Sequence, residues 1–252
     1  MPNPYLSVII PSYNEALNFK KGKMEHVYSY LKTQKFTFEI IFVDDGSTDN
    51  TVALLTEFSQ GKHEIKVIAN KHLGKGPTVA LGLISAEGEN RLFTDFDQAT
   101  PIEEADKLLP FRNHGYDVVI GSREVEGAKR EREPLYRHIM GKGFNIIVKL
   151  FIIRGINDTQ CGFKLLSRKA CEKLVPMLSA SKVTKVRKDA FTGAFDVELL
   201  FVARKNNFRV AEVPVSWQHF KTDRVNPVKD SLRMFFEVIK IRINALMGKY
   251  AS

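Results

Sequence analysis

The chain has 252 residues, of which 44% are hydrophobic and 27% charged, and it contains no low-complexity tract, repeat or long Gly/Ser/Pro linker. This composition is typical of one globular α/β domain and excludes a disordered or fibrous protein. The net charge of +9 and the pI near 9.4 favour polyanionic partners, such as nucleic acid, an anionic membrane surface or phosphorylated small molecules.

The first half of the chain alternates short apolar runs with segments of helical periodicity. Ser47 or Thr48 can cap the helix that follows them. Strands that alternate with helices predict crossover connections and a mostly parallel sheet flanked by helices. The predicted strands span residues 6–11, 38–43, 65–69, 91–94 and 117–121, and the helices span 14–32, 50–60, 76–86 and 102–109.

The second half is less regular. We expect one α/β domain over residues 1–220 and a basic, amphipathic C-terminal extension over residues 221–252. The elements expected here are a charged loop at 124–133, a long helix at 135–151, a turn and strand at 158–164, helices at 168–177 and 195–205, a strand at 209–217 and an amphipathic helix at 231–246.

Neither cysteine carries an evident function. Cys161 and Cys171 show no disulfide pattern and no metal-site spacing, which favours a reducing compartment. The polar N-terminus shows no signal peptide. The longest apolar stretch, 144–153, is interrupted by Asn145 and Lys149 and is too short to cross a bilayer. We therefore expect a cytoplasmic protein that associates with membranes only peripherally.

Polar clusters follow the predicted strands at the points where each strand ends. In parallel α/β sheets, ligands bind beyond the carboxyl ends of the strands. We therefore expect these clusters to meet on one rim of the sheet and to form the binding site. They are residues 11–15, Asp44 with Asp45, Asn70, residues 95–97 and residues 121–123.

The Asp95-Phe96-Asp97 segment is the candidate metal site. Mg²⁺ and Mn²⁺ prefer carboxylate oxygen, and phosphates and water usually complete their shell. One carboxylate can hold the metal while the other holds a sugar hydroxyl or a metal-bound water. The alternative is a pair of solvated acidic residues in a turn, one of them capping a helix.

Two further segments are candidates for binding a nucleotide. One carboxylate of Asp44 and Asp45 can accept a hydrogen bond from a nucleobase or a ribose, although a turn with a helix cap at Ser47 also explains this segment. Lys75 lies among glycines before a helix, so it and backbone N–H groups can meet a phosphate. The P-loop spacing is absent, and an exposed lysine in a glycine-rich connection is the alternative.

Arginines and carboxylates in the second half are candidates for binding a second substrate. Arginine binds phosphate with two parallel hydrogen bonds, and Arg123 and Arg137 are the best placed. The glutamates between them also allow a solvated, self-compensating loop. Asp196 and Glu198 are two apart on a predicted helix, so they cannot both face one site. The six histidines form no ligand pattern.

Taken together, the motifs resemble glycosyltransferase family 2, which has the GT-A fold. The resemblance runs from Leu6 to about Trp217. Within the family, the chain is most similar to the polyprenyl-phosphate sugar transferases, and more to the glucosyl than to the mannosyl members. The mannosyl members usually read Asp-Ala-Asp-Leu-Gln, so Phe96 and Ala99 are departures. The matching segments are 7–15, 43–49, 70–76, 95–100, 121–123, 158–164 and 195–200.

The resemblance implies a site and a reaction. Asp97 with Asp95 would hold Mg²⁺ or Mn²⁺, and Arg123 and Arg137 would hold the phosphate of a polyprenyl lipid, which attacks the sugar with inversion. A phosphate is already anionic at pH 7, since its second pKa is about 6, so no general base is needed. A donor of the UDP-glucose or GDP-mannose type would contact Pro11, Tyr13, Glu15, Val43, Asp44, Asp45, Asn70, Lys75, Gly76 and Asp95.

Other functional hypotheses also stay open. A family 2 enzyme that acts on a glycan hydroxyl would need Asp196 or Glu198 as a base. A nucleic-acid-binding protein is suggested by the charge alone, without any stacking or binding motif, and we expect no nucleic-acid partner. The basic C-terminal helix can rest on a membrane or pack on the domain, and lipid access could instead depend on a separate membrane subunit.

Overall fold

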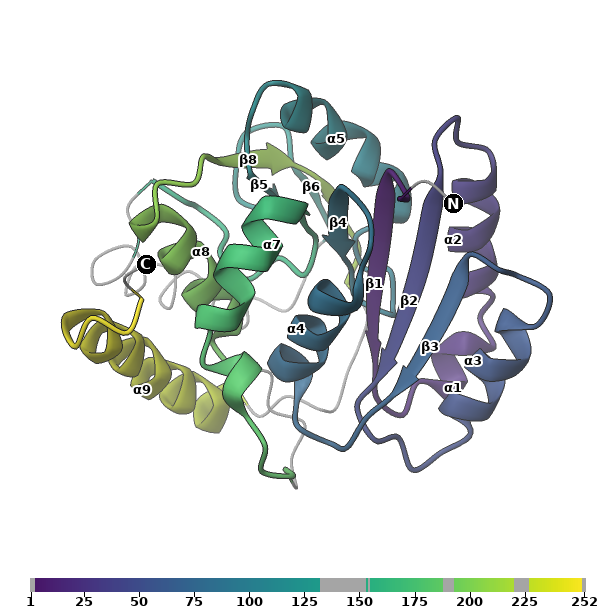
Figure 1. Cartoon of the computed structure of the whole chain (residues 1–252), viewed down its shortest axis with the longest axis horizontal. Helices are drawn as coiled ribbons and strands as arrows, with labels where there is room; N and C mark the ends of the chain where they lie inside the picture. Colours follow the sequence, from purple (N-terminus) through teal and green to yellow (C-terminus); the bar gives the residue numbers. More distant parts are fainter. Residues whose placement is uncertain (1–2, 132–152, 154, 188–192, 220–226, 251–252) are drawn as a thin grey trace.

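A computed structural model of the chain describes residues 3–131, 153, 155–187, 193–219 and 227–250 (Figure 1). A seven-stranded sheet has the order β3-β2-β1-β4-β7-β5-β8, and β6 pairs with β9 separately. The strands are β1 (Leu6–Ser12), β2 (Phe38–Asp44), β3 (Ile65–Ala69), β4 (Asn90–Phe93), β5 (Val118–Ser122), β6 (Lys129–Arg130), β7 (Lys164–Ser167), β8 (Val210–Pro214) and β9 (Ser216–Trp217).

The sheet is mostly parallel, as predicted. Only β7 runs antiparallel, between β4 and β5, and the sequence did not indicate this strand direction. In the parallel pairs, Ser12 lies opposite Asp44, and Asp44 lies opposite Ala69. The ends of these strands therefore share one edge, and β7 starts at that same edge, with Lys164 opposite Phe93. β5 also ends at this edge, with Ile120 opposite Lys164. The predicted polar clusters therefore share one rim, and their role as a binding site stays a prediction.

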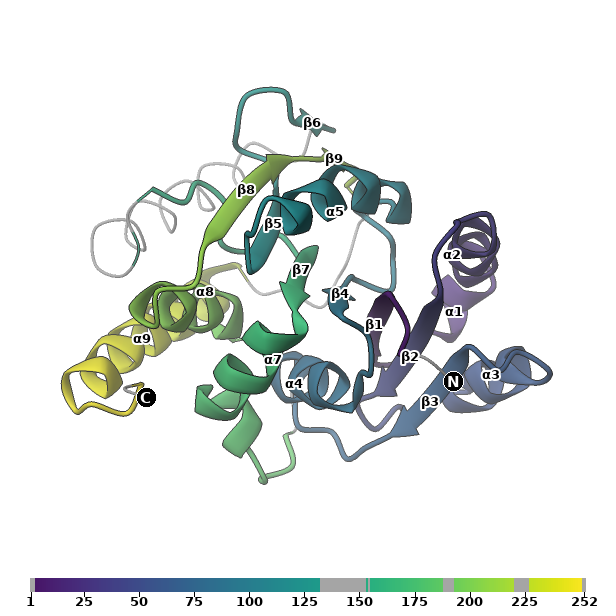
Figure 2. The ribbon, with the colours of Figure 1, turned by 45° about the horizontal axis from the view of Figure 1, so that its top comes forward.

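Helices cover both faces of the sheet (Figure 2). Because side chains alternate along a strand, Ile9 and Ile41 enter one core cluster while Val8 and Ile40 enter the other. The first face carries α4 (Lys75–Ser85), α7 (Arg168–Leu174), α8 (Phe195–Lys205) and α9 (Pro227–Leu246), and the second carries α1 (Ala16–Phe19), α2 (Lys23–Lys32), α3 (Thr51–Ser59) and α5 (Ala105–Asn113).

Some helix boundaries differ from the predictions. Gly22 divides the helix expected over 14–32 into α1 and α2, because its positive φ of 73° is incompatible with a right-handed helix. The cap prediction for α3 is wrong: its N-cap is Asn50, without a side-chain bond, because Ser47 is bonded to Asp44 instead. The helix expected over 135–151 lies outside the described residues.

The C-terminal helix α9 is part of the first core cluster. Its Val238 and Ile241 are 2% and 4% exposed. Four residues after the end of α9, the hydroxyl of Tyr250 donates a 2.5 Å hydrogen bond to the carboxylate of Glu198 in α8. The division at residues 220 and 221 stays a prediction. Over the described part of the chain, every helix is too short or too polar to traverse a bilayer.

Replacing Tyr250 with phenylalanine should destabilise the protein by about 2 kcal/mol, because a buried hydrogen bond to a charged group is lost. Urea unfolding measures this difference. Tyr30→Phe is the matched control, since its hydroxyl donates a 2.6 Å bond to Asp106 at the exposed surface, and its cost should stay below about 1 kcal/mol. Equal costs for the two variants would contradict an anchoring role of Tyr250.

Candidate active site

The two predicted metal ligands lie in the turn after β4. Asp95 accepts a short charge-assisted hydrogen bond from the ammonium group of Lys75, the first residue of α4. Asp97 accepts a 3.0 Å bond from the backbone N–H of Ala99, which fixes its carboxylate in the turn. Phe96 between them is 3% exposed and packs near Phe42, with ring centroids 6.4 Å apart. It is therefore a core residue.

Opposing charges are concentrated at this turn. Burial, together with the negative charge of Asp95, raises the pKa of Asp97 above its ordinary value. Burial opposes the positive charge of Lys75, but Asp95, Asp196 and Asp97 outweigh it and raise the Lys75 pKa. Lys75 is therefore cationic at neutral pH, while Asp97 carries a charge that its surroundings disfavour. A divalent cation held by Asp97 would relieve that cost.

The residues present fit a divalent cation that is shared with a ligand. The described residues contain no group of three or more His, Cys, Asp or Glu side chains able to hold a metal ion. This part of the chain therefore offers Asp95 and Asp97 as carboxylate ligands and leaves other positions to phosphate oxygens and water. Mg²⁺ and Mn²⁺ sites that bind nucleotide diphosphates have this composition.

Gly162 lies directly against the carboxylate of Asp95. A Cβ atom added at residue 162 would lie 2.6 Å from Cγ and 2.8 Å from Oδ1 of Asp95. These distances are too short for non-bonded atoms, and the carboxylate is already held by Lys75. Only glycine at this position therefore leaves Asp95 where it is.

Gly162→Ala should lower the rate of substrate turnover by about a hundredfold, since displacing a positioned group by about 1 Å has an effect of that size. The measurement is kcat/KM for the donor together with the free energy of unfolding. Gly61→Ala is the control, because nothing lies within 4 Å of an added Cβ there. Because Gly61 has a positive φ, an alanine there can be strained, and this strain should lower the free energy of unfolding without changing kcat/KM. Full turnover in Gly162→Ala would show that Asp95 need not stay in place.

The second acidic cluster holds the loop before α4. Asp45 accepts hydrogen bonds from the backbone N–H groups of Leu73, at 2.7 Å, and Gly74, at 3.0 Å. It also lies 2.8 Å from Nδ1 of His72. The His72 ring stacks on Tyr13, with centroids 4.2 Å apart and planes within 7°. Asp45 thereby joins the β2 end to the loop that carries Lys75, and the two rings form one aromatic surface.

The other predicted donor residues have varied environments. Asp44 accepts bonds from Ser12 and Ser47 and closes its own turn. Val43 is fully buried in the core cluster, so its side chain is not available to a ligand. Gly76 lies under α8, where an added Cβ would be 3.0 Å from Phe195.

Three more residues of this set lie on the rim itself. Pro11 and Asn70 are half-buried there. Glu15 is 9% exposed and close enough to help raise the Asp97 pKa.

Arg123, at the end of β5, forms a buried ion pair with Asp158. Its Nε and Nη2 donate bonds of 2.7 and 2.9 Å to the two carboxylate oxygens, and its backbone N–H adds a third of 3.0 Å. The guanidinium also lies 5.4 Å from the centroid of Trp217, which Arg130 approaches from 5.5 Å. Within the described residues, Nη1 of Arg123 makes no hydrogen bond. Arg137 lies outside them.

Asp196 and Glu198 have different partners, as their spacing predicted. Asp196 accepts a short hydrogen bond from Lys164, which is fully buried at the start of β7. Glu198 accepts bonds from the backbone N–H and the hydroxyl of Ser179 and from Tyr250. Both carboxylates are thus already engaged by donors, and Glu198 belongs to the packing of α8. Neither arrangement favours a general base.

Four residues of the site were missed by the sequence analysis as functional contacts. Asp158 and Gly162 belong to the turn before β7 and contact Arg123 and Asp95, and Lys164, the first residue of β7, contacts Asp196. One signal was visible in the sequence: a lysine between Phe163 and Leu165 needs a buried partner. His72 was considered only as a metal ligand or base, and its stacking on Tyr13 had no sequence signal.

The chain matches known glycosyltransferases over most of its length. The model of the family "Glycosyl transferase family 2" matches residues 7–175. A dolichyl-phosphate beta-glucosyltransferase of Dictyostelium discoideum is 33% identical over 260 residues, covering 98% of this chain and 76% of the relative. The Homo sapiens protein of the same name is 33% identical over 265 residues, covering 99% and 78%.

Solved structures show the same fold. Glucosyl-3-phosphoglycerate synthase from Mycobacterium tuberculosis, in complex with Mn²⁺, UDP and glucosyl-3-phosphoglycerate, has a TM-score of 0.60 at 16% identity, with 98% of this chain and 80% of that chain covered. A mannosyltransferase from Pyrobaculum calidifontis with GDP-Man and Mn²⁺ has a TM-score of 0.56 at 18% identity, with 88% and 59% covered. With a GT-A fold, a family match over more than half of its residues and relatives of 33% identity, the chain belongs to glycosyltransferase family 2.

Proposed function

We propose that this enzyme transfers a glucosyl group from a nucleotide-diphosphate sugar to a polyprenyl phosphate of the dolichyl type, with inversion at the anomeric carbon and with Mg²⁺ or Mn²⁺. The names of relatives at 33% identity over nearly the whole chain support these substrates. One observation carries the proposal at the site. The turn over residues 158–162 contacts Asp95 through Gly162 and holds Arg123 through Asp158, so the donor side and an arginine are joined rigidly.

The reaction is a single displacement. An oxygen of the lipid phosphate attacks the anomeric carbon and forms the new C–O bond, while the bond from that carbon to the diphosphate breaks. The nucleoside diphosphate leaves with the bonding electron pair. Because the acceptor is already anionic at pH 7, with a second pKa of about 6, no proton has to be removed by the protein.

On the donor side, residues of this chain bind the nucleotide sugar and neutralise the charge of its departing diphosphate. Asp95 and Asp97 would hold the divalent cation, which when bound supplies positive charge to the departing diphosphate. Lys75, kept cationic by Asp95, Asp196 and Asp97, adds charge beside the same group. The stacked Tyr13 and His72 rings offer an aromatic surface at the rim for the nucleoside.

On the acceptor side, Arg123 would hold the lipid phosphate, together with Arg137 from the part of the chain that is not described. Its bonds to Asp158 fix the guanidinium plane. The guanidinium lies 5.4 Å from the Trp217 ring centroid, and the Arg123 side chain is only 19% exposed. A guanidinium fixed in this way loses little further conformational entropy when a phosphate binds.

A polyprenyl acceptor is embedded in a membrane, so the enzyme has to act at a membrane surface. We place it in the cytoplasm, in peripheral contact with the bilayer. Cys161 and Cys171 are buried and unpaired, which suits a reducing compartment. The net charge of +9 favours contact with anionic lipid.

The test is a transfer assay with the whole chain, Mg²⁺ or Mn²⁺, a polyprenyl phosphate in detergent and labelled UDP-glucose or GDP-mannose. We expect glucose to appear in the lipid fraction as a β-linked phosphodiester. The control acceptors are polyprenol without phosphate and a glucan oligosaccharide. Transfer to the oligosaccharide but not to the polyprenyl phosphate would overturn the proposal in favour of a hydroxyl acceptor.

A further inference from the structure

Helix α9 carries an apolar stripe on its outer surface. Leu232, Phe236, Ile239, Ile243 and Leu246 recur at steps of four, three, four and three residues and therefore share one face of the helix. Their exposed fractions are 61%, 61%, 39%, 49% and 79%. Five large apolar side chains in a row on a surface need an explanation, because single exposed ones are ordinary but contiguous ones are not.

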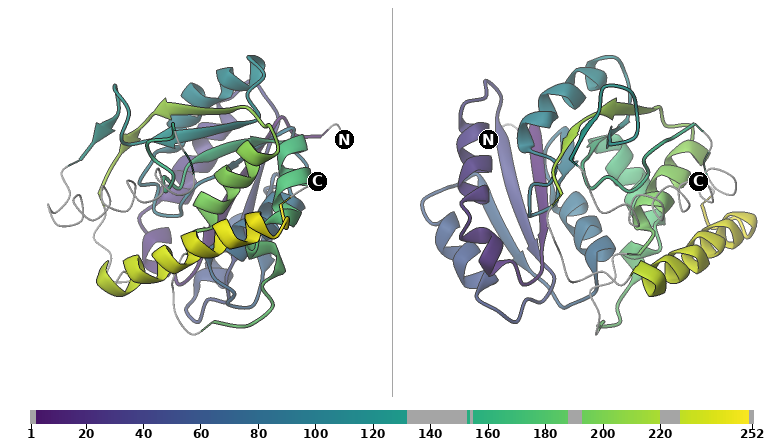
Figure 3. Two further views of the ribbon diagram at one scale, coloured as in Figure 1. Left: turned by 90° about the vertical axis from the view of Figure 1, so that its left-hand side faces the viewer. Right: turned by 180° about the vertical axis from the view of Figure 1, so that it is seen from behind.

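The opposite face fixes this helix to the domain. Val238 and Ile241 are buried, and Ala194 donates its backbone N–H in a 2.5 Å bond to Glu237. The stripe is thus held pointing away from the core. The two views in Figure 3 show α9 lying along the outside of the molecule beside α8.

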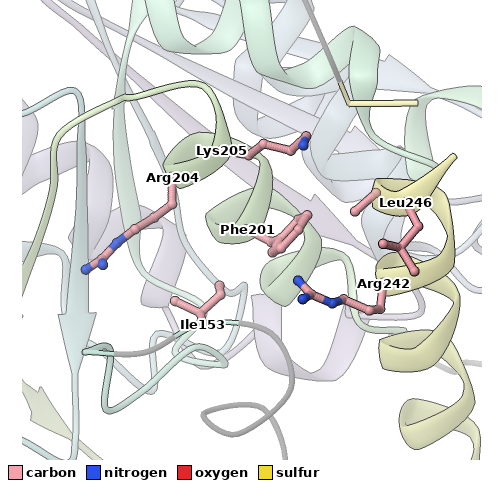
Figure 4. A pocket seen from close by; sticks show the side chains of 7 residues that line it. Ile153, Phe201, Arg204, Lys205, Arg242 and Leu246 are labelled. Atoms are coloured by element: carbon pink, nitrogen blue, oxygen red, sulfur yellow. The ribbon is translucent and has the colours of Figure 1, made fainter. Parts of the chain in front are cut away.

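Cations border the stripe where α9 meets α8. A pocket of about 440 Å³ opens between these helices, and Figure 4 shows Arg242 reaching from α9 toward Phe201 of α8. Arg204 and Lys205, at the end of α8, line the same pocket, as does Leu246 of the stripe. The sequence from Val238 to the C-terminus contains Lys240, Arg242 and Lys249 and no acidic residue.

We infer that this surface docks on an anionic phospholipid bilayer: the stripe of α9 inserts at the boundary between headgroups and acyl chains, and the pocket receives a lipid phosphate. The choice of partner rests on charge complementarity and on the proposed function, which requires a membrane-borne acceptor. An apolar face bordered by Lys and Arg is the arrangement that binds at such an interface. The long basic side chains can bury their methylene groups while their charges reach the phosphates.

The docking helix is attached to two segments of the active site. The bond from Ala194 to Glu237 lies two residues before Asp196. About one turn earlier in α9, the Gln160 side chain donates to the sulfur of Met234 over 3.6 Å, and Gln160 belongs to the turn between Asp158 and Gly162. The docking helix is thus attached to the segment before Asp196 and to the turn whose Asp158 holds Arg123, the proposed phosphate ligand.

The experiment is flotation of the whole chain with phosphatidylcholine vesicles, with and without phosphatidylserine. We expect binding to the anionic vesicles only. Ile243→Asp with Leu246→Asp, and separately Lys205→Glu with Arg242→Glu, should each lower the partition coefficient by at least about tenfold. The matched controls are Leu17→Asp, an equally exposed leucine on α1 (77%), and Lys173→Glu, an exposed lysine on α7. Both controls should bind as the unaltered chain does.

Equal binding by all variants, or an equal loss in the controls, would overturn the inference. So would absence of vesicle binding together with a dimer that Ile243→Asp dissociates, because a second copy would then cover the stripe. Transfer to a short-chain polyprenyl phosphate in detergent separates the two proposals. If the stripe variants retain this transfer but no longer bind the anionic vesicles, the docking surface is supported. If the unaltered chain binds vesicles through the stripe but transfers no sugar, the docking surface stands and the proposed function fails.

Discussion

Asp97→Asn should lower kcat/KM for sugar transfer by at least about a thousandfold, which corresponds to the several kcal/mol that a metal ion contributes to stabilising a leaving group. Asparagine keeps the size of the side chain and can still accept the bond from the Ala99 N–H. The change therefore removes a charge and little else. Asp97 is the carboxylate whose charge burial and Asp95 disfavour, so the metal-free variant should be at least as stable as the unaltered chain.

Two measurements separate this role from a structural one. Thermal unfolding with Mn²⁺ and a nucleoside diphosphate should show a ligand-induced rise in Tm for the unaltered chain and almost none for Asp97→Asn. Glu57→Gln, at an exposed position on α3, should retain both the rise and the activity. A variant that is active and still stabilised by Mn²⁺ would remove Asp97 from the metal site and leave Asp95 alone there.

The fold could be predicted from the sequence where local periodicity decides it. The first five strands, α4 and α8 follow from apolar spacing and lie within a residue or two of their predicted bounds. The antiparallel direction of β7 could not be predicted, because four residues carry no directional signal. It follows from the turn that returns the chain to the same edge of the sheet.

The candidate site could be predicted only up to its local motifs. Each strand-end cluster was visible because its residues are neighbours in the chain. The bonds between clusters join residues far apart in sequence, such as Lys75 with Asp95, Arg123 with Asp158 and Lys164 with Asp196. A single amino-acid sequence does not reveal which distant residues contact each other. Arg123 was therefore predicted as a phosphate ligand without its carboxylate partner.

Asp158, the partner of Arg123, is the site of the second large predicted effect, which is on the free energy of unfolding. Asp158→Asn should destabilise the protein by about 3–5 kcal/mol at pH 7, because it leaves the Arg123 guanidinium buried without its counter-charge. Asp158 is fully buried and also accepts bonds of 3.2 Å from the N–H groups of Gln160 and Cys161. The loss should therefore loosen the turn that carries Gly162, and urea unfolding measures it.

The pH dependence of this difference follows from the pKa of Asp158. Burial alone would raise it, but Arg123 outweighs burial and lowers the pKa to about 2. A carboxylate with a lowered pKa stabilises the folded state above its unfolded pKa of about 3.9. That contribution is lost as the pH falls toward 2. Unfolding curves of the unaltered chain and Asp158→Asn should thus be far apart at pH 7 and converge below about pH 4.

The double variant Arg123→Met with Asp158→Asn separates the ion pair from the acceptor site. With no buried charge left unpaired, it should recover part of the stability that Asp158→Asn loses. Its transfer to polyprenyl phosphate should nevertheless stay low, with a raised KM for the lipid, since the phosphate ligand is gone. Arg123→Lys should keep some lipid affinity through its charge while losing the two-bond geometry. If the double variant regains both stability and transfer, Arg123 serves the fold alone and another cation holds the acceptor phosphate.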